Sequence, residues 1–448
     1  MKLFNVKLTT LKSKLYAIVI ASLVVRVVAF FALPDTASNL GPDEGNYGAL
    51  AEWIAQGKPA DEYPSYSFLY IISRTLIIPA SILHNSLDIN GLNAVRIVSS
   101  LYGFLTLCLA VYLITRTINL REDFSKWVSN NQPMVLLLFM VFTFMPSHLI
   151  WSILGLRDAA MEFWVLVIFV FIFNIFEVNL NPSKLWFIGI LVGIPLVFSS
   201  RPQVGWVLGI TLLVFSLTKS KSRAAKILIP LTIIGIFSGH YLTTQSTTTQ
   251  STTTQSTTTQ STTTQSTTTQ STTTQSTTTL SPLASLINQA DSIPNRHRVN
   301  KIDAASAIKT LACPITKESR FQKYLCAAYR APYTTYTFLV RPMLGADVTS
   351  TQSLFAAVEN VFWLGAFLFI ILMFIRNRRL AFFGALAPSL LFFVIYSLTA
   401  GAYEGNMGTA FRHKSFLLWV VILLLASTIV ATQQRKAEQQ GISGSSQE

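Results

Sequence analysis

The chain has 448 residues, of which 51% are hydrophobic and only 12% are charged. Soluble globular proteins carry about 25% charged residues, so this chain has too little polar surface to cover a water-soluble globule. The composition also excludes a wholly disordered chain, a collagen and a small disulfide scaffold, and it predicts an all-α polytopic membrane protein. The net charge of +14 then indicates membrane orientation rather than nucleic-acid binding.

Ten apolar runs are long enough, or nearly so, to form membrane helices, which need roughly 20 mostly apolar residues. They lie at about 15–33, 94–114, 133–152, 158–178, 185–200, 203–218, 227–243, 353–375, 380–400 and 411–432. The run at 66–83 is ambiguous, because Arg74 lies in its middle and Pro79 interrupts it. We expect this run to be a membrane-dipping or interfacial segment.

The positions of Lys and Arg predict that both termini are cytoplasmic. With 66–83 outside, 17 of the 34 Lys and Arg residues lie on the inner side, including the clusters at 219–226 and 376–379. Counting 66–83 as a span would move both clusters outside, against the positive-inside rule. The basic N-terminal stretch lacks a small-residue cleavage site, so it predicts a retained first helix. We expect residence in a plasma membrane, such as a bacterial inner membrane.

Two long outer regions divide the chain into modules. These are an N-terminal membrane module at 1–243 with the first outer loop at 34–93, a low-complexity stretch at 244–280, an outer loop at 281–352, C-terminal membrane helices at 353–432 and a cytoplasmic tail at 433–448. The low-complexity stretch contains STTTQ six times between Ser246 and Gln275, followed by one STTTL. This composition cannot bury a core, so we expect a disordered spacer, with an O-glycosylated stalk as the alternative. In the loop after it, Cys313 and Cys326 are candidates for a disulfide if the compartment is a periplasm.

The most informative stretch is GPDEGNY, which begins at Gly41. Pro42 suits the first position of a helix, and Gly57 suits its C-terminal cap. One face of this helix is apolar, so we expect it to lie flat on the outer membrane surface; the face comprises Tyr47, Leu50, Ala51 and Ile54. Asp43 and Glu44 fall in its first turn, where they are either capping carboxylates or a general base or metal-facing acid at the lipid–water boundary.

A second acid, Asp158, has a similar position at the outer end of the fourth predicted span. A charge that borders hydrocarbon needs a partner. Two interpretations stay open: Arg157-Asp158 is a local topological marker, or Asp158 shares one polar site with Asp43 and Glu44.

Basic residues break the positive-inside bias at the outer helix ends. They are Arg26, Arg201, Arg341 and the triplet Arg412-His413-Lys414. A phosphate or pyrophosphate on a lipid carrier explains this pattern, because Arg matches phosphate oxygens bidentately and Lys supplies a point charge. The alternative for each is snorkelling toward lipid headgroups. Glu359 is an intramembrane acid that is expected to pair with one of these bases.

Several motifs are missing from the sequence. It has no Walker loop, nucleophile elbow, HExxH motif or CxxC metal spacing. Their absence argues against an ATP-driven pump and a membrane zinc protease.

With these residues assembled, the chain resembles the GT-C glycosyltransferases. That superfamily includes protein O-mannosyltransferases, the lipid A aminoarabinose transferase and bacterial oligosaccharyltransferases. The resemblance rests on PDEGNY with Asp43-Glu44, on PSYSFLY, on AVRIVSSLYG and on LRDAAMEF with Asp158. It covers roughly residues 10–215 and, more loosely, GNMGTAFRHK near the C-terminus. The chain lacks a WWD-type signature and a large C-terminal soluble domain, which argues against protein N-glycosylation.

The resemblance implies about ten transmembrane helices, with juxtamembrane helices in the first outer loop. It also implies transfer of a sugar from a polyprenyl-phosphate carrier to a glycan, lipid or protein acceptor on the outer face. Asp43 would be the general base, while Glu44 and Asp158 would hold the acceptor or a divalent ion, Mg or Mn. The donor phosphate would be bound by Arg201, Arg341, Arg412, His413 and Lys414, with Lys58 as a positional candidate for the family's further basic residue.

Two other functions remain alternatives. A polysaccharide polymerase or O-antigen ligase would use a polyprenyl-linked pyrophosphate donor. A secondary transporter would place ionisable groups near the bilayer midplane, on broken helices of two related halves. Membrane lipids are expected partners in every case, and nucleic acid is not.

Overall fold

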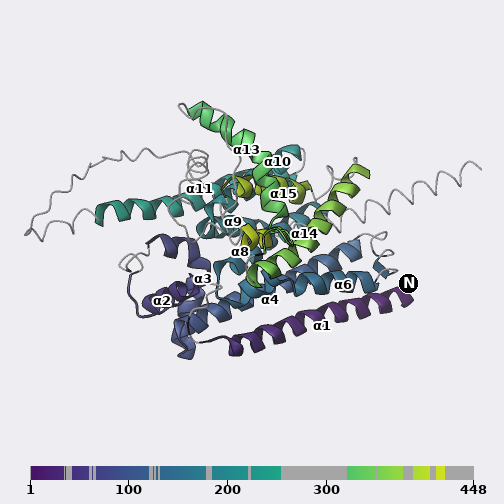
Figure 1. The fold of residues 1–448 in the computed structure, drawn as a ribbon, viewed down its shortest axis with the longest axis horizontal. Coiled ribbons are helices and arrows are strands. Elements are labelled where there is room, and N and C mark those ends of the chain that lie inside the picture. The colour runs from purple at the N-terminus through teal and green to yellow at the C-terminus, as the bar shows by residue number, and fades with distance from the viewer. Residues whose placement is uncertain are drawn as a thin grey trace, which may run out of the picture.

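A computed structural model describes residues 2–34, 36, 43–59, 63, 67–120, 125, 128–129, 132–177, 184–219, 223–253, 320–348, 351–376, 387–403 and 410–418. Within these ranges the regular structure is helical and no strand is present, which agrees with the predicted all-α class (Figure 1). In chain order the helices are α1 (Lys2–Ala32), α2 (Asp43–Ala55), α3 (Ser67–Leu87), α4 (Gly91–Leu120), α6 (Gln132–Thr143), α7 (Pro146–Ile153), α8 (Arg157–Glu177), α9 (Lys184–Ser200), α10 (Pro202–Thr218), α11 (Arg223–Thr253), α13 (Arg320–Val340), α14 (Thr351–Arg376) and α15 (Ala387–Tyr403). Residues 410–418 are also helical and are called the 410–418 segment below.

Three helices in the described ranges are long and apolar enough to cross a membrane. They are Leu11–Ala32 of α1, Gly91–Arg116 of α4 and Arg157–Ile175 of α8. A fourth span results if α6 and α7, which are bent by 43° relative to each other, count as one broken helix. The chain is therefore an α-helical membrane protein by length and composition.

Ten complete spans are not found among the described residues. Parts of α9, α10, α11, α14 and α15 are apolar for only 10–17 residues, which is less than a bilayer core requires. One cause is visible between α9 and α10, where Arg201 adopts an extended backbone and Pro202 starts a new helix. Most of the last predicted span, beyond residue 418, lies outside the described residues.

Helix α2 has the predicted bounds but not the predicted environment. It ends shortly before Gly57, whose φ of 72° is the left-handed conformation expected at a helix C-terminus. However, Tyr47, Leu50 and Ala51 are buried in a core with residues of α3 and α4. The prediction that this stripe lies on the membrane surface is therefore wrong, because the neighbouring helices cover it.

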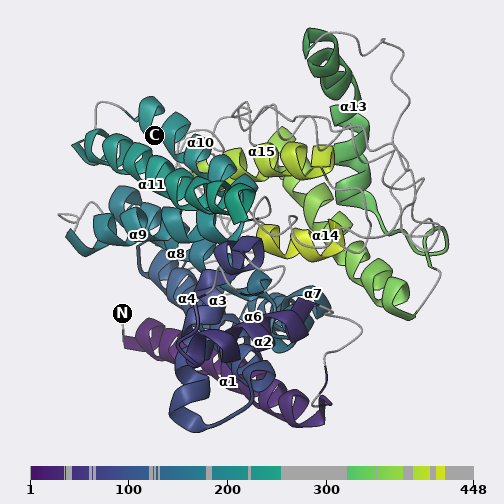
Figure 2. The same cartoon turned by 90° about the vertical axis from the view of Figure 1, so that its left-hand side faces the viewer.

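The 66–83 run is contained in the single helix α3, which packs against α2, α4 and α9. Its position relative to a membrane stays a prediction. Helices α9, α10 and α11 pack on one another, as Figure 2 shows. Helix α11 continues past residue 243 to Thr253, so it includes the first STTTQ unit, and the predicted disordered spacer stays a prediction for the stretch as a whole. The rest of the repeat lies outside the described residues.

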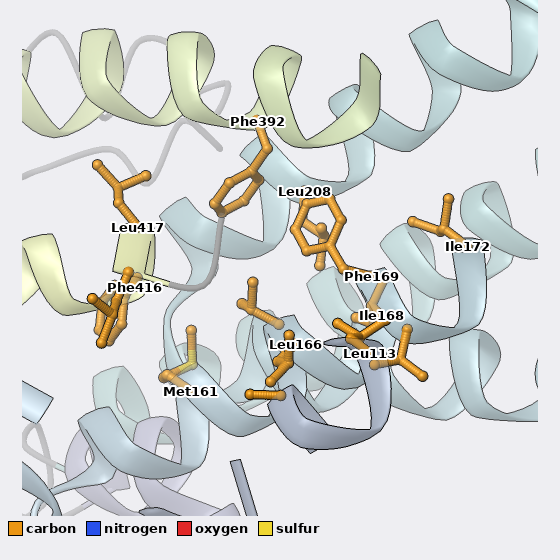
Figure 3. Close-up of a cluster of buried hydrophobic side chains, with 14 of the residues drawn as sticks. Leu113, Met161, Leu166, Ile168, Phe169, Ile172, Leu208, Phe392, Phe416 and Leu417 are labelled. Atoms are coloured by element: carbon orange, nitrogen blue, oxygen red, sulfur yellow. The ribbon is translucent and has the colours of Figure 1, made fainter. Parts of the chain in front are cut away.

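The largest core joins the 410–418 segment to helices from the first half of the chain (Figure 3). Phe169 of α8 makes an edge contact with Phe392 of α15, with ring centroids 5.5 Å apart. Phe392 stacks on Tyr396, which in turn contacts Phe416. These aromatic contacts join the 410–418 segment to α15 and α8, and Arg412 of this segment lies beside Asp158 at the start of α8.

Helix α13 packs against α15 and α14 (Figures 1 and 2). Cys326 of α13 is buried and disulfide-bonded, and Cys108 of α4 is a free thiol. Cys313, the third cysteine and the predicted partner, lies outside the described residues.

Candidate functional site

Asp158 is the centre of a cluster of charged side chains at the start of α8. Arg201 Nη2 donates a hydrogen bond of 2.7 Å to Asp158 Oδ1, and Arg412 Nε lies 3.1 Å from Asp158 Oδ2. The Asp158 side chain is only 1% exposed, and two guanidinium groups compensate its charge, although only its Oδ1 accepts a hydrogen bond among the described residues. Three segments that are far apart in the sequence therefore meet at one acid.

The local backbone explains why these side chains converge. Asp158 lies in the first turn of α8, where the helix N–H groups also favour a negative charge. Gly155, with a φ of 60°, makes the turn between α7 and α8. Arg201 is the extended residue between α9 and α10, and its side chain lies over the ring of Phe416 at 5.4 Å.

Asp43 lies at the exposed edge of this cluster. Its side chain is 44% exposed, and its Oδ2 is 3.8 Å from Nη1 of Arg412. Arg412 therefore lies between the two acids, Asp43 and Asp158, that the sequence predicts to share one site. Both acids, together with Arg201 and Arg412, are brought together as expected.

Arg157 and Tyr47 also belong to the cluster, although the sequence analysis gave neither a role in it. Arg157 donates from Nη1 to the Ser200 carbonyl at 3.3 Å, and its charge acts on Tyr47 and Asp158. Burial, above all, raises the pKa of Tyr47, so this side chain stays a neutral phenol. A sequence signal for Tyr47 did exist, because it lies one helical turn after Asp43 and shares its face.

His413 borders the cluster from the 410–418 segment. Its ring stacks on Phe416 with centroids 5.7 Å apart, and its carbonyl accepts a hydrogen bond from the Tyr396 hydroxyl. The charges of Arg201, Arg412 and Arg157 act on His413. The predicted phosphate role of His413 stays a prediction.

Lys414 is held in a closed set of oxygen atoms. An ammonium has three N–H donors, and those of Lys414 have acceptors at the carbonyls of Leu339 and Arg341, 3.0 and 2.6 Å away, and at Asn360 Oδ1, 2.6 Å away. The side chain is fully buried. Lys414 therefore caps the end of α13, and this geometry does not support its predicted contact with a donor phosphate.

Glu44 is separated from Asp43 by its own buried ion pair. Arg96 of α4 donates to both carboxylate oxygens of Glu44 at 3.1 and 2.9 Å, and neither side chain is exposed. Arg96 also donates to the carbonyls of Pro34 and Thr36, after α1. Glu44 thus ties α2 to α4 and to the chain that follows α1, and this closed pair does not support the predicted acceptor or metal role.

The two remaining predicted phosphate ligands have other partners. Arg341 donates from Nε to Asp347 Oδ2 at 2.9 Å, and this pairing lowers the pKa of Asp347. The ammonium of Lys58 lies 4.4 Å from the centroid of the Trp53 ring. The geometry therefore gives Arg341 and Lys58 local roles, in a loop and at the end of α2.

A second buried polar network joins α1, α7 and α8, and of its members the sequence had singled out only Arg26. Arg26 donates to Ser152 Oγ and to His148 Nε2, each at 3.1 Å, and His148 Nδ1 lies 3.0 Å from a carboxylate oxygen of Glu162. A guanidinium can only donate, so Nε2 is the acceptor and Nδ1 carries the proton. Glu162 lies one turn after Asp158, so this network fixes the rotation of α8 about its own axis.

The charge of Lys414, one of the predicted bases, acts on Glu359 of α14, but both carboxylate oxygens of Glu359 have other hydrogen-bond partners. Its Oε2 accepts the backbone N–H of Ser147 at 2.7 Å, and its Oε1 accepts the indole N–H of Trp363 at 2.9 Å. Ser147 lies in the first turn of α7, where free N–H groups favour an anion. Glu359 therefore caps the second half of the broken α6–α7 pair.

The residues present do not fit a divalent metal. Among the described side chains, no group of three or more His, Cys, Asp and Glu is placed to hold an ion. Asp43 and Asp158 both face Arg412, whose guanidinium lies where a bridging cation would have to bind. The predicted Mg or Mn is therefore not supported by this geometry.

Comparisons with known proteins do not identify the chain further. No known protein-family model matches it, and no curated protein matches it significantly in sequence. The function must therefore be argued from the cluster itself: two aspartates, three arginines and one buried tyrosine.

Proposed function

We propose that the protein is an integral membrane glycosyltransferase that moves a sugar from a polyprenyl-phosphate carrier to an acceptor on the extracytoplasmic face. The observation that carries this proposal is the convergence of three arginines, at 157, 201 and 412, on the buried Asp158, with the exposed Asp43 beside Arg412. Arginine suits phosphate oxygens, because its planar guanidinium binds them bidentately.

In this proposal the two acids have different roles. Asp43 is exposed, so it can accept the proton of an acceptor hydroxyl as that oxygen attacks the anomeric carbon. The bond from that carbon to the phosphate oxygen then breaks, and Arg201 and Arg412 stabilise the departing phosphate. Asp158 is buried and paired with both arginines, so it orients them rather than exchanging a proton.

The proposal includes the finer topology. The short apolar helices α9, α10, α11, α14 and α15, extended by their flanking residues, complete about ten spans with both termini in the cytoplasm. The positive-inside distribution of Lys and Arg supports this arrangement, and a bacterial plasma membrane is the compartment that goes with it. A polyprenyl-pyrophosphate donor, as used by polymerases and ligases, suits the same arginines.

A secondary transporter is the second candidate, and one observation favours it. The α6–α7 pair is a broken helix, and the buried Arg26–His148–Glu162 network lies beside the break. Transporters place ionisable groups on broken helices of this kind. The two candidates differ in outcome, because a transporter moves a solute and produces no glycosylated product.

The test compares the wild-type protein with Asp43→Asn and with a matched control, Asp88→Asn. Asp88 is exposed at the end of α3 and has a φ of 53°, a conformation that Asn tolerates. Each protein is reconstituted in liposomes with a panel of polyprenyl-phosphate-linked sugars and a cell-envelope extract, and released polyprenyl phosphate is measured by mass spectrometry.

We expect the wild type and Asp88→Asn to release the carrier equally, and Asp43→Asn to be slower by about 10²- to 10⁴-fold, the usual loss of a general base. Equal release by all three proteins would show that Asp43 is not the base. Solute flux without any carrier release would favour the transporter.

A further inference from the structure

Arg412 contacts its two acids with different atoms and at different distances. Its Nε lies 3.1 Å from Asp158, which is 1% exposed, and its Nη1 lies 3.8 Å from Asp43, which is 44% exposed. The Asp158 contact is the shorter and more buried ion pair of the two, although neither Arg412 Nε nor Asp158 Oδ2 has a hydrogen-bond partner among the described residues. Arg412 is therefore anchored through Nε at a buried acid, while its Nη1 has a loose and exposed partner.

This geometry makes the Nη1 contact exchangeable. A guanidinium offers five N–H donors in one plane, so Arg412 can keep Nε on Asp158 while its outer nitrogens change acceptor. Exposed ion pairs are weak, with a median worth of about 0–1 kcal/mol. The phosphodiester of the donor offers two non-bridging oxygens that share its negative charge, and it can form bidentate contacts with arginine, so it competes with one exposed carboxylate.

We propose that Arg412 is an exchange switch that couples donor binding to the release of Asp43. Without donor, Nη1 of Arg412 holds the carboxylate of Asp43. When a polyprenyl phosphate binds, its phosphate takes Nη1, and Asp43 becomes available to the acceptor hydroxyl. This inference rests on the proposed function and adds an order to it: donor binds first, and the base is freed only then.

The switch makes a counterintuitive prediction about affinity. Asp43 competes with the donor for Arg412, so removal of its charge strengthens donor binding while it abolishes transfer. Binding of polyprenyl phosphate to purified protein in nanodiscs is measured for the wild type, Asp43→Asn, Asp88→Asn, Arg412→Gln and the double variant Asp43→Asn/Arg412→Gln. We expect Asp43→Asn to bind about two- to fivefold more tightly than the wild type, in line with the strength of an exposed ion pair, and Asp88→Asn to bind like the wild type.

The double variant separates the exchange from general electrostatics. If Asp43 acts through Arg412, then Asp43→Asn gives no gain in affinity when Arg412 is already Gln. Arg412→Lys is included with a thermal unfolding measurement, because it preserves the charge if Arg412→Gln does not fold. A lysine cannot reach both acids with separate nitrogens, so the gain from Asp43→Asn should also disappear in this background.

Three outcomes overturn the inference. Equal or weaker binding by Asp43→Asn shows that Asp43 does not compete with the donor. A gain that persists without Arg412 shows simple charge repulsion. Failure of the wild type to bind polyprenyl phosphate at all removes the proposed function and the switch together, and this result is distinct from the other two.

Discussion

Asp43 and Glu44 are adjacent acids whose environments differ completely. Asp43 is half-exposed beside Arg412, whereas both oxygens of Glu44 are bound by Arg96 in a buried pair. Removing one partner of a buried pair leaves an uncompensated charge and typically costs about 3–5 kcal/mol. We therefore expect Glu44→Gln to lower the free energy of unfolding strongly and Asp43→Asn to leave it nearly unchanged, as measured by chemical denaturation in detergent.

The partner residue supplies the control for this prediction. Replacing Glu44 and Arg96 together, by Gln and Met, removes both buried charges and should restore part of the stability that Glu44→Gln loses. If the double variant loses as much unfolding free energy as the two single variants together, then the Glu44–Arg96 pair does not explain the effect.

At the residue scale the sequence predicted four of the charges that converge, but it also included Glu44, Lys58, Arg341 and Lys414, which have other partners. Asp43, Asp158, Arg201 and Arg412 stand out because charges at the outer helix ends need a reason. The enclosure of Glu44 and Lys414 was not predictable, because their partners are distant: Arg96 is 52 positions from Glu44, and the Leu339 carbonyl is 75 from Lys414. Periodicity and local spacing carry no information about such contacts.

At the scale of elements, the position of Asp43 depends on how closely α2 packs against α4. Gly48 of α2 lies against α4 so closely that a Cβ on it would be 2.7 Å from the Leu92 backbone nitrogen. Backbone cannot move aside as a flexible side chain can, so Gly48→Ala must separate the two helices. We expect a loss of about 1–3 kcal/mol in unfolding free energy, the usual cost of overpacking.

Gly365 of α14 is the matched control for Gly48→Ala. A Cβ added there meets nothing within 4 Å. Alanine favours a helix over glycine by about 1 kcal/mol, so Gly365→Ala should be neutral or stabilising in the same denaturation experiment. If both substitutions have the same effect, then the close contact between α2 and α4 does not limit stability.

At the scale of elements, the ends of α2 were predictable and its neighbours were not. A proline favours the first position of a helix and a glycine favours the position after its end, and these local preferences are visible in the sequence. The apolar stripe of Tyr47 and Leu50 shows only that one face is buried, and either lipid or protein can cover such a face. The structure covers it with α3 and α4.

At the scale of the whole molecule, the number of membrane spans is the property on which sequence and structure differ most. Composition predicted the all-α class correctly, but length and hydropathy yield only three or four full spans in the described ranges. Short helices at prolines, such as α9 and α10, make the number of spans hard to derive from hydropathy. A segment spans the membrane when it crosses the full thickness of the bilayer core, and it need not be one continuous helix.

Orientation can be tested without knowing the substrate. In the proposed topology Lys219, after α10, is cytoplasmic, and Val348, after α13, is extracytoplasmic. Each is replaced by cysteine in a Cys108→Ala background, and intact cells are treated with a membrane-impermeant maleimide. We expect labelling at Val348→Cys in intact cells and at Lys219→Cys only after permeabilisation. Labelling of Lys219→Cys alone in intact cells would contradict the proposed orientation of the segments after α3, and with it an outward-facing donor site at Asp158.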